Sequence, residues 1–74
     1  MTKAEREDYE RRCVGAWQGY TGNNLYEVMH PDHGDPVIVR APDDNSAIVT
    51  AAAHWKEKWT AIRFYAYCNV RRLT

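Results

Sequence analysis

The order of apolar and polar residues near the N-terminus predicts an amphipathic helix over residues 2–20. Thr2 and Glu5 have the spacing of a capping box, in which the side chains at a helix start satisfy backbone N–H groups. The opposite face of the segment is charged, so we expect the apolar stripe to dock onto another part of the molecule. That stripe consists of Tyr9, Cys13, Trp17 and Tyr20.

The next two segments predict a β-hairpin. Residues 24–30 alternate, with Tyr26 and Val28 on one side, and residues 37–41 are short and β-branched. The stretch between them, HPDHGDP, is rich in Pro and Gly and reads as a turn.

A second helix is predicted over residues 44–58. Asp43 is the expected N-cap, and Asp44 sits in the first turn, where the helix dipole favours negative charge. Lys56 and Lys58 would lie in the last turn, where cations are favoured. The apolar stripe that should face a sheet consists of Ile48, Ala51, Ala52, Trp55 and Trp59.

The C-terminal stretch AIRFYAYCNVRRL predicts a final strand, because its apolar residues recur with a period of two. The apolar face would hold Ile62, Phe64, Ala66, Cys68 and Val70. The other face would hold Arg63, Tyr65, Tyr67, Asn69 and Arg71.

These elements predict one small domain over residues 1–74 of the α+β class, in the order α-β-β-α-β. We expect a three-stranded sheet packed against one or two helices. The last strand fits beside either strand of the hairpin, and the N-terminal helix fits either on the same layer as the second helix or at its flank.

Size and composition favour binding over catalysis. A domain of 74 residues buries only about 60% of its unfolded surface and has little room for a deep pocket. The sequence has no Ser/His/Asp set, no glycine-rich phosphate loop and no paired carboxylates on rigid elements, so we expect no enzyme and no cofactor. His30 and His33 lie close to Asp32 and Asp35, but we interpret this segment as a polar turn and expect no metal.

Charge and cysteine content refine the class of protein. The formal net charge is zero, which argues against a generic polyanion binder. Residues 54–74 nevertheless carry five cationic side chains and one anionic side chain. Residues 13–53 carry one cationic side chain and five anionic ones. Two cysteines make no disulfide framework, and no segment has the length of a membrane span or the apolar region of a signal peptide. We therefore expect a cytoplasmic, reduced protein.

The final strand also suggests nucleic-acid binding. The RNA-recognition motif contains the pattern [K/R]-G-[F/Y]-[G/A]-[F/Y]-V-x-[F/Y], which RFYAYCNV matches at Arg63, Tyr65, Ala66 and Tyr67 and misses at the other defined positions. Bases stack on such rings. The alternative interpretation is that the tyrosines pack in the core or contact a protein.

Residues 25–55 resemble the strand-turn-strand-helix pattern of small proteins from bacterial conjugative elements and phages, the DpnD/PcfM-like family. The shared motif is APDDNSAIVTAA, from Ala41 to Ala52. The resemblance implies an accessory protein of a mobile element. Such proteins include inhibitors of host defence, among them anti-CRISPR proteins, which act by covering a surface of a host protein.

We therefore expect a non-enzymatic protein-binding module, an inhibitor or adaptor whose partner is a host protein such as a nucleic-acid-binding complex. Two surfaces are candidates for contact. An aromatic and basic surface consists of Arg63, Tyr65, Tyr67 and Arg71, and an acidic one that could mimic phosphates consists of Glu27, Asp32 and Asp35. The alternative function is binding of single-stranded RNA or DNA through the first surface. Pairing of an exposed edge strand into a homodimer also stays open.

Overall fold

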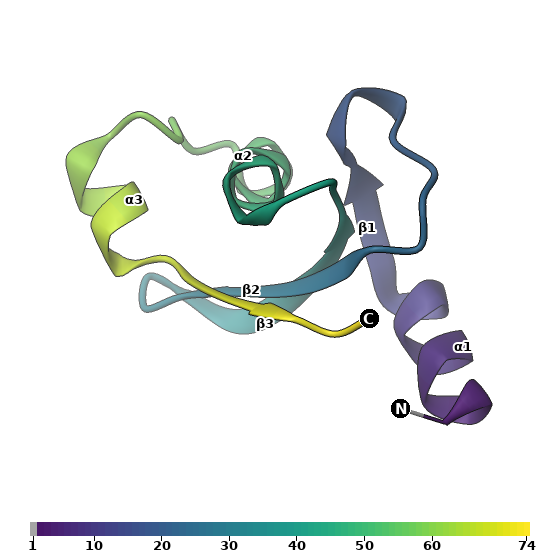
Figure 1. Ribbon diagram of the computed structural model, residues 1–74. Coiled ribbons are helices and arrows are strands. Elements are labelled where there is room, and N and C mark those ends of the chain that lie inside the picture. The colour runs from purple at the N-terminus through teal and green to yellow at the C-terminus, as the bar shows by residue number, and fades with distance from the viewer. Residues whose placement is uncertain (1) are drawn as a thin grey trace.

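A four-stranded mixed sheet forms the centre of the computed structural model, which describes residues 2–74 apart from the side chains of Ile62 and Arg63 (Figure 1). Its strands lie in the order β1, β3, β2, β4. Strand β1 runs parallel to β3, and the other two pairings are antiparallel. The elements are α1 (Lys3–Arg12), β1 (Cys13–Ala16), the 3-10 turn η1 (Trp17–Gly19), β2 (Leu25–His30), β3 (His33–Arg40), α2 (Asp44–Trp55), α3 (Ile62–Tyr67) and β4 (Asn69–Arg72). The α+β class is confirmed, and β1 adds a strand to the three expected.

Helix α2 covers one face of the sheet and makes the main core (Figure 1). Alternate residues of β2 and β3 point toward it and meet its small side chains. The buried cluster consists of Tyr26, Val28, Val37, Val39, Ala41, Ala47 and Ala51. A second cluster of Ile48, Ala52 and Phe64 joins α2 to α3.

The predicted N-terminal helix is correct only as far as Arg12. Thr2 caps α1, since its Oγ1 accepts a hydrogen bond from the Glu5 backbone N–H at 3.2 Å. From Cys13 the chain is extended, so the expected helical stripe does not form, and α1 buries none of its residues. Gly15 lies where β1 approaches α2, because a Cβ there would come within 3.3 Å of the Thr50 Cγ2.

The hairpin of β2 and β3 is confirmed, but β3 begins at His33 and takes in most of the segment that was predicted as the turn. The cap of α2 is also confirmed, because the Asp43 side chain accepts a hydrogen bond from the Ser46 N–H at 2.8 Å. The helix ends earlier than predicted. Lys56 takes a left-handed conformation with φ of 59°, and the Glu57 N–H donates to the Ala52 carbonyl at 2.8 Å, as at a Schellman-type helix end. Lys58 and Trp59 therefore leave the helix.

The predicted final strand is wrong over residues 62–67, which form α3 instead. Phe64 is 4% exposed and packs against Ile48 and Ala52. Its ring stacks on His30 with centroids 4.8 Å apart. Cys68, four residues later, packs on the same core, so a helical spacing connects the buried positions of this segment.

Only residues 69–72 form the last strand, and β4 pairs with β2 at the edge of the sheet. Of the two positions left open by the sequence, the one beside the first hairpin strand is correct. Strands β1 and β4 are the two edges. Within the described residues, no helix is long and apolar enough to span a bilayer.

Replacing Phe64 should test the α3 packing. Phe64→Ala removes a buried ring, and we expect a loss of about 3–5 kcal/mol in the free energy of unfolding, measured by urea denaturation. Tyr67→Ala is the matched control, because Tyr67 is 61% exposed, and we expect a change within about 0.5 kcal/mol. Equal losses for the two variants would contradict a helix that buries Phe64 and exposes Tyr67.

Candidate binding groove

Two adjoining hollows on the helical side of the molecule share the side chains of Trp59 and Tyr65. The first has a volume of about 390 Å³ and is lined by Trp59, Thr60, Tyr65 and Ala66. The second has a volume of about 380 Å³ and is lined by Trp17, Asp43, Asn45, Ser46, Val49, Trp59 and Tyr65. We call these two hollows together the aromatic groove.

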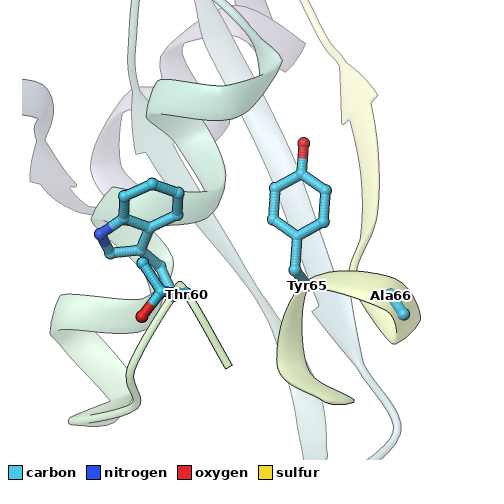
Figure 2. A pocket seen from close by; sticks show the side chains of 4 residues that line it. Thr60, Tyr65 and Ala66 are labelled. Carbon is cyan, nitrogen blue, oxygen red and sulfur yellow. The ribbon is translucent and has the colours of Figure 1, made fainter. Parts of the chain in front are cut away.

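Tyr65 is fixed in position at the groove. Its backbone belongs to α3, and its hydroxyl donates a hydrogen bond to the Asn45 Oδ1 at 2.7 Å, so the ring spans from α3 to the first turn of α2. Figure 2 shows the ring standing up from α3 beside an open gap, with Thr60 across the gap and Ala66 on the neighbouring part of α3. The ring is still 43% exposed. A side chain held in this way loses little further freedom when a partner covers it.

Two tryptophans complete the groove. Trp59 is 46% exposed and reaches the surface because α2 ends at Lys56, before the position where the helical stripe would have buried it. Trp17 begins η1 and packs with one side against the main core. The sequence predicts both tryptophans in apolar stripes of helices. Three tryptophans in 74 residues were the available signal, but which of them face solvent depends on where the helices end.

Among the described residues that line the groove, Asp43 alone carries a charge. Hydrogen bonding from the backbone N–H of Ser46, then from its side chain, holds the pKa of Asp43 below its ordinary value. Asp44 follows in the first turn of α2. The groove is therefore apolar and has a carboxylate at one end that stays ionised at neutral pH.

The aromatic and basic surface expected from the sequence does not form as one strand face. Tyr65 lies in the aromatic groove, but Tyr67 lies in a different hollow of about 390 Å³, which it shares with Met29, His30 and Asn69 among others. The side chain of Arg63 lies outside the described part of the structure.

Arg71 does not line any of the hollows that contain Tyr65 or Tyr67. It is on β4 opposite Glu27 of β2, and its Nη2 is 3.3 Å from the Glu27 Oε1. The neighbours Val70 and Val28 pack with the α2 core, so the Arg71 and Glu27 side chains point to the other face of the sheet. One residue of the predicted basic surface thus pairs with one of the predicted acidic surface.

The two other acidic candidates lie at the hairpin. Asp32 is in the turn and Asp35 is near the start of β3, and both are exposed. His30 is buried, and its Nδ1 accepts a hydrogen bond from the Asp32 N–H at 3.1 Å. His33 stacks on Trp55 with centroids 4.4 Å apart. Across the described residues, no three His, Cys, Asp or Glu side chains gather in a way that would hold a metal ion.

Neither cysteine forms a disulfide. Both are partly buried, and burial raises the pKa of the Cys68 thiol. A raised pKa leaves little reactive thiolate at neutral pH, so Cys68 has the properties of a packing residue and not of a nucleophile.

Comparison of the chain with known protein families, with curated proteins and with solved structures finds no match.

The cap at Asp43 generates a pH prediction. Because its pKa is lower in the folded than in the unfolded chain, its stabilising effect is complete above pH about 4 and is lost as the pH falls through the folded value. Asp43→Asn keeps an acceptor for the Ser46 N–H but does not titrate. We expect the stability of the wild type to fall faster below pH 4 than that of Asp43→Asn, in urea unfolding at a series of pH values. Parallel curves would show that Asp43 gains nothing from its charge in the fold.

Proposed function

We propose that this protein is a non-enzymatic protein-binding module, an inhibitor or adaptor that covers a surface of a host protein through the aromatic groove. The observation that carries the proposal is the pair of large rings, Trp59 and Tyr65, that remain about half exposed on either side of an open apolar hollow.

The chemistry of these residues supports a protein partner. Trp and Tyr are the residues that most often supply the binding energy of protein interfaces, because each buries a large area and has a polar group that can also bond. Contiguous apolar surface on a small domain is a feature of binding sites. The hydrogen bond from the Tyr65 hydroxyl to the Asn45 Oδ1 also holds one of these rings in place before a partner binds.

Electrostatics make single-stranded RNA or DNA the less supported partner. A nucleic-acid groove places cations beside its stacking rings to neutralise phosphates. Here Asp43 is the charged residue of the lining, and Arg71 is paired with Glu27 on the opposite face of the sheet. The Asp43 carboxylate would therefore repel a phosphate placed in this hollow.

Inhibition of a host protein is the role that the resemblance of residues 25–55 to mobile-element proteins suggests. An anti-CRISPR-type inhibitor acts by occlusion and requires a surface of suitable shape and no reactive side chains. A groove without paired catalytic groups suits such a mechanism, and a partner that itself binds nucleic acid would bring a basic surface toward Asp43. The acidic hairpin residues Asp32 and Asp35 would be a secondary contact.

Substitutions in the groove should weaken partner binding and leave the fold intact. We expect Trp59→Ala and Tyr65→Ala each to weaken binding of an identified partner by about 2 kcal/mol or more, roughly 30-fold, because the removed rings are interface anchors. The partner would be identified by affinity capture from a bacterial host lysate, and then the binding constant would be measured by calorimetry with purified proteins.

Val14→Ala is the matched control, since Val14 is 43% exposed and lies outside the groove lining. Circular dichroism would verify that every variant folds. Unchanged affinity in both groove variants would overturn the proposed site. In a parallel measurement of fluorescence anisotropy, tight salt-dependent binding of single-stranded RNA or DNA would overturn the proposed class of partner.

A further inference from the structure

The aromatic groove combines three rings with one carboxylate. Trp17 comes from η1, Trp59 from the segment after α2 and Tyr65 from α3, and all three line the same hollow with Asp43. We propose that this hollow binds a cationic side chain, Arg or Lys, presented by the protein partner. The inference rests on the proposed function and specifies the chemistry that the groove recognises.

The three rings that line the hollow can attract a cation. The face of an aromatic ring carries partial negative charge, and a cation placed over it is attracted, most strongly by Trp. Two of the three rings here belong to tryptophan. The three rings come from three separate segments of the chain and line the same hollow.

The lining of the hollow also offers hydrogen-bond acceptors to a cationic side chain. Arg and Lys donate hydrogen bonds and accept none, so a site for them needs acceptors. The lining offers the Asp43 carboxylate, which accepts hydrogen bonds from Ser46, and the Asn45 Oδ1, which accepts one from the Tyr65 hydroxyl. A carboxylate has about four lone-pair sites and an amide oxygen has two, so both groups can accept a further hydrogen bond. No cation stands among the described lining residues, so a bound guanidinium or ammonium meets no like charge there.

The balance of charge at the start of α2 also favours a cationic ligand. A helix N-terminus alone would attract anions, with an effective charge of roughly +0.5. Asp43 at the cap and Asp44 in the first turn reverse that sign, because they bring two carboxylates to the same end. An apolar hollow with a net negative end complements the cationic part of a partner and disfavours an acidic or phosphorylated one.

Capped tripeptides provide a direct test on the intact protein. Acetyl-Gly-Arg-Gly-amide would be titrated into isotopically labelled protein, and the indole N–H signals of the three tryptophans followed by NMR. We expect the Trp17 and Trp59 signals to shift. Trp55 is an internal reference, because it packs against the core and His33 and is not part of the groove lining.

The citrulline peptide is the matched probe, since citrulline has nearly the shape of arginine without its charge. We expect it to bind about tenfold more weakly, which is the size of a favourable cation–π and carboxylate contribution. Equal binding of the two peptides would overturn the cation proposal. So would an absence of shifts at Trp17 and Trp59 with the arginine peptide up to a concentration on the order of 10 mM.

Two variants separate the contributions of ring and charge. Asp43→Asn retains the helix cap and removes the carboxylate, and we expect it to reduce the preference for arginine over citrulline severalfold. Trp59→Ala should abolish the shift at Trp17 as well. An unchanged preference in Asp43→Asn would overturn the role of the carboxylate.

The two proposals fail in different experiments. If the arginine peptide shows no preference but Trp59→Ala still abolishes partner capture, the cation inference fails and the protein-binding function stands. If partner binding is unaffected by Trp59→Ala, the proposed function itself fails, whatever the peptides show.

Discussion

The packing of a helix with a small-residue face onto a twisted hairpin is the contact on which the rest of this structure depends. Ala47 and Ala51 of α2 are completely buried against the β-branched and aromatic residues of β2 and β3, including Val28, Val39 and Tyr26. Alanine has no side chain beyond Cβ, so the helix axis can lie close to the sheet and the larger strand residues fill the space between them. The same closeness reaches β1, where Gly15 lies against Thr50.

The two ends of α2 explain why the aromatic groove is where it is. The N-terminal end carries Asp43, which gives the groove its negative charge. It also carries Asn45, whose Oδ1 accepts a hydrogen bond from the Tyr65 hydroxyl. At the C-terminal end, the left-handed Lys56 stops the helix and releases Trp59 to the surface. Phe64 then packs against Ile48 and Ala52 of α2, which brings the next residue, Tyr65, alongside α2. The groove is thus a consequence of how one helix begins, ends and is covered.

The elements that the sequence predicted correctly are those whose signals are local. A polar cap followed by an apolar stripe identified α2, and a Pro/Gly turn between alternating segments identified the hairpin.

The errors arose where local signals were ambiguous. The spacing of Tyr9, Cys13 and Trp17 fits a helix, but Cys13 to Ala16 gains more by pairing with β3. In residues 62–67, six residues of alternating character cannot distinguish a short helix from a strand, and the burial of Phe64 beside α2 decides it. Tyr65 was therefore expected on a strand face and lies instead on α3 in the candidate groove, beside Trp17, Trp59 and Asp43, which only tertiary packing brings together.

Net charge and local charge lead to different conclusions in this molecule. The chain is neutral overall, so a long-range field that steers partners toward it is weak. Two arginines form ion pairs within the molecule, Arg40 with Glu10 and Arg71 with Glu27. Among the described residues that line the groove, the one charged group is the Asp43 carboxylate. An interaction at this groove must therefore derive its strength from short-range contacts after water has left, where ring faces and a single carboxylate count for more than they do in bulk solvent. That distribution favours recognition of one well-placed side chain over adhesion to a uniformly charged surface.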